Sequence, residues 1–184
     1  MHSEHTFKQY DAELEALRGK VLEMGGLVEQ QIVQALEALV KLDSNLAKEV
    51  MVNDQLVNAL EVQIDEGCSQ IIARRQPAAG DLRMVMMMVK TITDLERIGD
   101  EATKIARTAQ KIFDEDRMYK PRFNEIKSMV ALVREMLRTA LDGFARLDVS
   151  KTVEVAKQDE QVDEHFRSAM RQLITFMLED PRTI

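Results

Sequence analysis

Residues 74–102 read RRQPAAGDLRMVMMMVKTITDLERIGDEA and contain a helix end, a short turn and the start of another helix. Pro77 cannot continue a helix, because it lacks a backbone N–H and restricts the residue before it, and Gly80 follows shortly after. Beyond Asp81 apolar residues recur at spacings of three and four, the period of an amphipathic helix. The stretch therefore predicts two helices that run antiparallel. The residues predicted to face inward are Val85, Met88, Val89, Ile92, Leu95, Ala102 and Ala106.

The same period extends in both directions from this turn. Upstream, it predicts a first helix from about Tyr10 to Lys41. It also predicts a second helix, which is capped by Asp43 and ends at Arg75. Downstream, the third helix continues to about Asp114. Three long helices joined by short turns form an antiparallel bundle.

The second half of the chain repeats the first with a constant offset of 105 residues. Asp43 corresponds to Asp148, and Asp54 corresponds to Asp159, with apolar positions in register between them. The repeat predicts an all-α protein of two tandem three-helix bundles, residues 1–118 and 119–184. The second bundle is expected to be incomplete and, with an apolar face uncovered, to associate with itself or with a partner helix.

Composition narrows the class of protein. The chain of 184 residues is 45% hydrophobic and 31% charged, which is typical of a globular protein. A net charge of -7 argues against nucleic-acid binding, because that function needs a basic surface. The single cysteine, Cys68, excludes an internal disulfide, and no apolar run approaches the ~20 residues that span a bilayer. We expect a cytoplasmic protein.

Several carboxylates stand where apolar side chains belong. A helical projection places Glu96 and Asp100 in the sector of Val85 and Val89. The same projection places Asp54, Glu61 and Asp65 along one edge of the second helix's apolar stripe, which is a continuous row of inward positions.

Antiparallel pairing across the turn at Pro77 predicts that Glu61 meets Glu96 and that Asp54 or Asn58 meets Asp100. Clustered acids repel one another, and a hard cation bound by oxygen ligands would offset that repulsion. We therefore predict a divalent or trivalent metal, with iron, manganese or magnesium as candidates.

The same acids also fit a simpler interpretation. Acids at the edge of an apolar stripe are commonly solvated or paired with cations such as Lys104 and Arg107. Cys68 lies on an apolar face and is expected to be a small core residue, and His165 is expected to be structural.

Two segments resemble the signatures of the PhoU family. These are Arg75-Gln76-Pro77 followed by Asp81-Leu82-Arg83, and Asp94-Leu95-Glu96-Arg97-Ile98-Gly99-Asp100. The resemblance covers nearly the whole chain. It implies two similar three-helix bundles, often in a dimer, with metal bound at E(D)-x-x-x-D motifs in some members. Here that motif reads Glu96 to Asp100 and Glu61 to Asp65 in the first repeat.

In the second repeat Asp159 and Asp163 fit the motif, whereas Phe166 and Met170 stand at the positions of Glu61 and Asp65. The resemblance therefore implies that a first metal site can be complete and that a second cannot be, unless another chain supplies a helix.

The resemblance also implies a regulatory function. PhoU proteins report phosphate sufficiency from the phosphate ABC transporter to a sensor histidine kinase, and so restrain the phosphate-starvation response. We expect these two partners, a homo-oligomer, and contact with a membrane only through the partners.

Two other functions are weighed against this one. A carboxylate-bridged metal oxidase would also place acids inside a helical bundle, but its characteristic Glu-x-x-His pair does not occur here. A metal-free helical scaffold or adaptor predicts the same fold with solvated acids. Analysis of metal in the purified protein distinguishes these possibilities.

Overall fold

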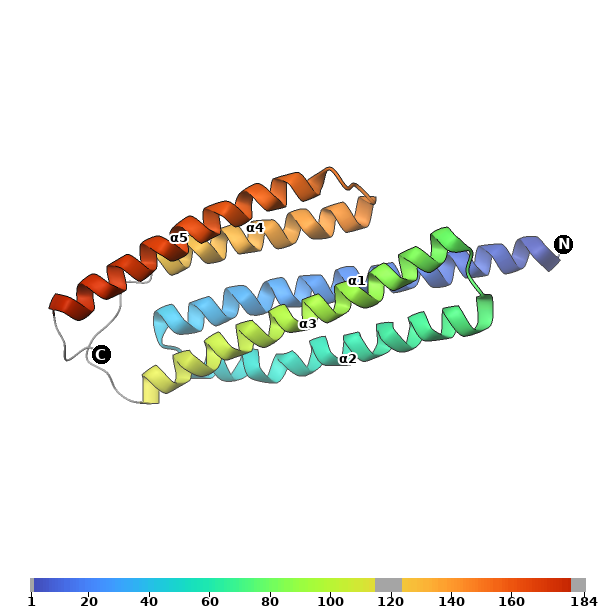
Figure 1. Ribbon diagram of the computed structural model, residues 1–184. Coiled ribbons are helices and arrows are strands. Elements are labelled where there is room, and N and C mark those ends of the chain that lie inside the picture. The colour runs from blue at the N-terminus through green and yellow to red at the C-terminus, as the bar shows by residue number, and fades with distance from the viewer. Residues whose placement is uncertain (1, 115–123, 180–184) are drawn as a thin grey trace. The chain divides into compact units, whose positions relative to one another are not determined.

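The structure is a computed structural model, and it describes residues 2–114 and 124–179. Five helices lie in these ranges, and no strand occurs in them. They are α1 (His2–Lys41), α2 (Ser44–Arg75), α3 (Ala79–Asp114), α4 (Asn124–Arg146) and α5 (Lys151–Glu179), as Figure 1 shows. The predicted all-α class is confirmed.

In the first unit the helix ends agree with the sequence to within about two residues, except at the start of α1, which begins at His2 and not near Tyr10. No glycine or proline lies between these two residues, so nothing in the backbone opposes the extra helical turns. The end of α2 lies at Arg75, where Pro77 predicts it.

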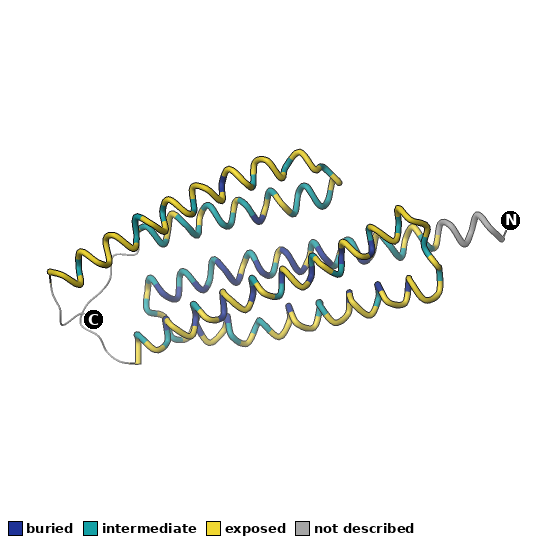
Figure 2. Tube along the Cα trace, in the orientation of Figure 1, coloured by how far each residue is buried: buried dark blue, intermediate teal, exposed yellow. Residues whose placement is uncertain are grey.

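The chain divides into two compact units, Met1–Asp114 and Glu115–Ile184. The predicted boundary between residues 118 and 119 lies outside the described residues. In the first unit α1, α2 and α3 all pack against one another, and buried residues recur along each of the three helices (Figure 2). The largest fully buried side chains of this core are Met24, Ile64, Met88, Ile92, Val21, Val28, Val50, Val57, Val85 and Cys68.

A tight turn joins α1 to α2. Leu42 adopts a left-handed conformation with φ 55°, and the Asp43 N–H donates to the Ala38 carbonyl at 3.0 Å, which closes the end of α1. The Asp43 carboxylate then accepts hydrogen bonds from the backbone N–H groups of Asn45 and Leu46 at 3.0 and 3.1 Å. One aspartate thus caps the start of α2.

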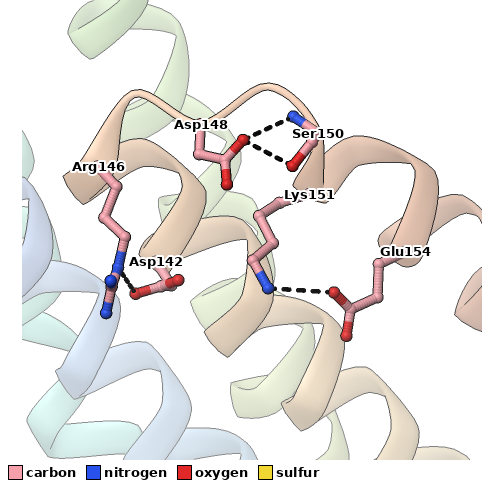
Figure 3. Close-up of polar contacts among 6 residues, drawn as sticks. All are labelled: Asp142, Arg146, Asp148, Ser150, Lys151 and Glu154. Carbon is pink, nitrogen blue, oxygen red and sulfur yellow. Dashed lines mark hydrogen bonds and ion pairs between the residues drawn. The ribbon is translucent and has the colours of Figure 1, made fainter.

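The same turn recurs between α4 and α5. Leu147 is left-handed with φ 56°, and the Asp148 N–H donates to the Gly143 carbonyl at 2.9 Å. The Asp148 carboxylate accepts from the Ser150 N–H at 2.9 Å and from the Ser150 hydroxyl at 2.7 Å (Figure 3). The repeat that the sequence predicts therefore extends to the backbone of this turn.

The second unit contains α4 and α5, which pack against each other. Within the described part of this unit only Leu137 and Gln158 are buried. One face of α5 carries large apolar side chains that are 40 to 56% exposed at helical spacing, namely Phe166, Met170, Leu173 and Met177. The two helices therefore cover each other only in part.

None of the described helices has a stretch that is both long and apolar enough to cross a membrane.

Candidate acidic site

Glu61 of α2 and Glu96 of α3 lie close together, as antiparallel pairing of the two helices predicts. Both side chains are half-buried. Burial raises the pKa of Glu61, and the nearby charges of Glu96 and Asp65 raise it further.

Asp54 takes a different partner from the one predicted. Its Oδ1 accepts a hydrogen bond from Nε2 of Gln31, a residue of α1 that is only 2% exposed, at 3.0 Å. Asp54 itself is half-buried. The carboxylate thus joins α2 to α1 and lies on the α3 side of this interface, next to Gly99.

Gly99 makes this arrangement possible. A Cβ atom at this position would lie 2.9 Å from Oε1 of Gln31, 3.4 Å from Oδ1 of Asp54 and 3.6 Å from Cγ1 of Val57. Any larger residue at this position would require the end of the Gln31 side chain to shift. The glycine of the ERIGD segment therefore serves close packing of three helices.

Asp100 is exposed, and the prediction that it faces the bundle is wrong. The centre of the buried stripe on α3 passes through Leu95 and Gly99, so Asp100 lies beyond its margin. Lys104 donates to Glu101 at 2.6 Å, and this hydrogen bond, with the charges of Glu101 and Asp100, raises the pKa of Lys104. The alternative of solvated, lysine-paired acids thus describes this end of the site.

The corresponding acids of the second repeat, Asp159 and Asp163, are both exposed. Asp163 accepts from Arg167 at 3.2 Å within α5. The side chains at the positions of Glu61 and Asp65, Phe166 and Met170, are also exposed. The structure therefore brings acids of α2 and α3 together in the first unit, whereas those of the second unit stay on one helix.

The donor set has the chemistry that hard cations prefer, since carboxylates supply only oxygen. Among the described residues, no three His, Cys, Asp or Glu side chains are grouped closely enough to hold a metal ion. Glu61 and Glu96 would be the first two ligands of such a site. Asp65 and Asp100 lie one turn away on the same two helices.

Two further titratable residues are structural. Cys68 is buried in the core, and burial raises the pKa of its thiol to about 11, so the thiol is almost entirely protonated at neutral pH. His165 of α5 makes a 2.8 Å contact through Nδ1 with Oε2 of Glu125 of α4, and Gln172 donates to the other oxygen at 3.0 Å. This contact ties the two helices of the second unit together.

Sequence reasoning missed Gln31 and Thr103. Both are 2% exposed, and neither Oε1 of Gln31 nor Oγ1 of Thr103 has a hydrogen-bond partner among the described residues. A signal for Gln31 was present, because it lies three residues after Val28 and four before Ala35 in the buried stripe of α1. A polar residue inside such a stripe indicates a buried partner.

Comparison with known proteins adds a family to this geometry. The family model for the PhoU domain matches residues 21–109 and 126–184, one match in each unit. A phosphate-specific transport system accessory protein PhoU homolog of Pseudomonas putida is 48% identical over 98% of this chain and 70% of its own length. The accessory protein PhoU of Escherichia coli K12 is 46% identical over 99% and 75%.

Two solved structures resemble the fold. The crystal structure of PhoU from Pseudomonas aeruginosa has a TM-score of 0.87 and 46% identity, covering 94% of this chain and 82% of that one. The phosphate transport system regulatory protein PhoU from Streptococcus pneumoniae has a TM-score of 0.83 and 28% identity, covering 93% and 80%.

Proposed function

This chain belongs to the PhoU family, and from that membership we propose that it regulates phosphate uptake and phosphate signalling. The proposal rests mainly on the family match, which extends over both helical units. Relatives that share nearly half of its residues over almost its whole length are named accessory proteins of the phosphate-specific transport system. The protein acts by binding other proteins, and it restrains the phosphate-starvation response when phosphate is plentiful.

The first partner is the phosphate ABC transporter, in keeping with the names of the relatives. The second is a sensor histidine kinase, and this part rests on family resemblance alone. In this proposal the protein works in the cytoplasm and reaches the membrane only through these partners. Binding and not catalysis carries the function, since the relatives are named for accessory and regulatory roles.

Affinity capture tests the transporter as partner. The tagged chain, incubated with detergent-solubilised membranes from phosphate-starved cells, should retain the transporter's ATP-binding subunit. Membranes from cells that lack the transporter genes provide the matched control. If the chain retains the same proteins from both preparations, it has not bound the transporter, and the transporter is not its partner.

We further propose that a hard cation binds at Glu61 and Glu96. This proposal makes the protein a metal-binding regulator, and the alternative is a metal-free adaptor of the same fold. The observation in its favour is that the carboxylates of Glu61 and Glu96 lie close together and are both half-buried. Burial, and then the charges of Glu96 and Asp65, raise the pKa of Glu61, and a bound cation would offset both effects.

Asp65 and Asp100 are the flanking acids, and Asp54 stays a predicted ligand of the same site. Asp159 and Asp163 stay predicted ligands of a second site, which another chain would have to complete. Iron, manganese and magnesium are all compatible with oxygen ligands.

The double variant Glu96→Gln and Asp100→Asn tests this site. It should lower the metal bound per chain, measured by elemental analysis after loading with manganese, while helicity by circular dichroism stays unchanged. The variant Asp159→Asn with Asp163→Asn is the matched control in the second unit and should retain the metal. Unchanged metal content in the first variant, or no metal in the parent chain under any loading condition, would favour the metal-free adaptor.

A further inference from the structure

Two deeply buried oxygen atoms of the first unit have no hydrogen-bond partner among the described residues. They are Oε1 of Gln31 on α1 and Oγ1 of Thr103 on α3, and each residue is only 2% exposed. A buried polar atom without a partner costs free energy, so folded proteins pair nearly all such atoms with protein groups or with ordered water. One shared partner would satisfy both oxygens.

Gly99 relates the two atoms to each other. A Cβ atom at Gly99 would lie 2.9 Å from Oε1 of Gln31, so this oxygen faces the backbone of α3 at that residue. Thr103 follows Gly99 by four residues, which places it on the same face of the helix about 6 Å further along the axis. The Cα–Cβ bonds of a helix tilt toward its N-terminus, so Thr103 leans back toward Gly99. Because Gly99 has no side chain, it leaves the space between the hydroxyl and the amide unfilled.

The hydroxyl of Thr103 differs from those of other threonines in these helices. Thr93, Thr108 and Thr175 each donate to the backbone carbonyl four residues earlier, at 3.0 to 3.1 Å. This bond satisfies a threonine within its own helix. Thr103 makes no such bond, so its hydroxyl is available to a group outside the backbone of α3.

We propose that one internal water molecule binds between Thr103 and Gln31 and links α3 to α1. The water donates one proton to Oε1 of Gln31 and accepts the hydroxyl proton of Thr103. Two hydrogen bonds of about 2.8 Å together reach roughly 5 Å, which spans the helical turn from Gly99 to Thr103 better than a single direct bond does. The Asp54 carboxylate, whose Oδ1 lies 3.4 Å from the same Cβ position, provides an acceptor for the second proton. Such a site has the polar partners that a buried water requires.

The water also stabilises one orientation of the Gln31 amide. Nε2 of Gln31 donates to Asp54 at 3.0 Å, which leaves Oε1 as the atom that must find a donor. A water that donates to Oε1 supplies this donor, so a single polar layer joins Gln31 of α1, Asp54 of α2 and Thr103 of α3. In the second unit Met136 stands at the position of Gln31, so the layer is particular to the first unit.

A double-mutant cycle in urea titrations tests the shared water. Thr103→Val keeps the shape of threonine and removes the hydroxyl, and it should lower the folding equilibrium constant about threefold or more, because the water loses an anchor. In a Gln31→Met background the same substitution should cost nothing, since the water has already lost its acceptor. Thr108→Val is the matched control, because the Thr108 hydroxyl bonds within its own helix, and its effect should be equal in both backgrounds. A higher folding constant for Thr103→Val in the parent chain, or an equal effect in both backgrounds, would overturn the proposal.

Crystal structures of the parent chain and of Thr103→Val locate the water directly. In the parent chain, one ordered peak should lie within about 3.2 Å of both Oε1 of Gln31 and Oγ1 of Thr103, and it should be absent from the variant. A direct hydrogen bond between the two side chains, or two ordered side chains with no peak between them, would contradict the water.

Discussion

Gln76, the residue that closes α2, adopts a left-handed conformation with φ 46° and ψ 62°. Its backbone N–H donates to the Ile72 carbonyl at 3.3 Å, and its side chain is exposed. A non-glycine residue pays roughly 1–2 kcal/mol for this conformation. The position therefore carries backbone strain that belongs to the RQP segment and not to the core.

We predict that Gln76→Gly stabilises the first unit by about 0.5–1 kcal/mol, because glycine adopts this conformation without strain but loses more entropy on folding. Ser69→Gly is the matched control on the exposed side of the same helix, and it should cost about 1 kcal/mol instead. Urea titrations followed by circular dichroism measure both. A loss of stability in Gln76→Gly would mean that the glutamine side chain has a structural role.

The residue scale is where sequence reasoning succeeded least. Pairing of Glu61 with Glu96 followed from antiparallel numbering, because it depends only on the position of the turn. The partner of Asp54 did not follow, because the numbering across the turn relates only α2 to α3, whereas Asp54 accepts its hydrogen bond from Gln31 of α1. Asp100 was misplaced because a projection cannot tell the centre of a stripe from its margin.

At the scale of the elements, the turn between α2 and α3 is tied to α1. Arg75 donates to both oxygens of Glu13, at 2.7 Å through Nη2 and 3.3 Å through Nε. The Arg75 hydrogen bonds lower the pKa of Glu13. Arg75 therefore belongs to the segment that predicts the turn and also holds α1 beside that turn.

We predict that Glu13→Gln destabilises the protein at pH 7 and has a much smaller effect near pH 3. The pKa of Glu13 is lower in the folded state, so its stabilisation is complete above its ordinary pKa of about 4.3 and disappears as the pH falls through the folded-state value. Thermal unfolding at both pH values measures the difference. Glu23→Gln, exposed on the same helix, should show little change between the two pH values. An effect of Glu13→Gln that is the same at both pH values would rule out the ion pair as its source.

The elements themselves were largely predictable. Periodicity located the helices of the first unit, Pro77 located the end of α2, and the offset of 105 residues located the second turn with its Leu147 and Asp148. The early start of α1 at His2 was missed, because residues before Tyr10 carry no apolar period to reveal a helix.

At the scale of the whole molecule, the two units differ in how well they bury their apolar surface. The first has a closed core between three helices, whereas the stripe of Phe166, Met170, Leu173 and Met177 on α5 is substantially exposed. At about 25 cal/mol per Å², even ~400 Å² of uncovered apolar surface forgoes roughly 10 kcal/mol, which is comparable to the total stability of a domain. A surface of this kind favours association.

We predict that the chain associates with itself at micromolar concentration, with an average mass above the 21.0 kDa of one chain that rises with concentration. Static light scattering measures this mass. Leu173→Glu with Met177→Glu should reduce association, and so should an appended family-type third helix, whereas Val52→Glu, at an exposed position of α2, should not. A constant mass of 21.0 kDa at all concentrations would show that this face does not mediate association.

Regulation of the phosphate response is tested most directly by deleting the gene in its own cells and measuring expression of a phosphate-starvation promoter in phosphate-rich medium. We expect the promoter to be active in the deletion strain and to be silenced again when the chain is supplied from a plasmid. Expression that stays low after deletion, in cells with no second family member, would contradict the account.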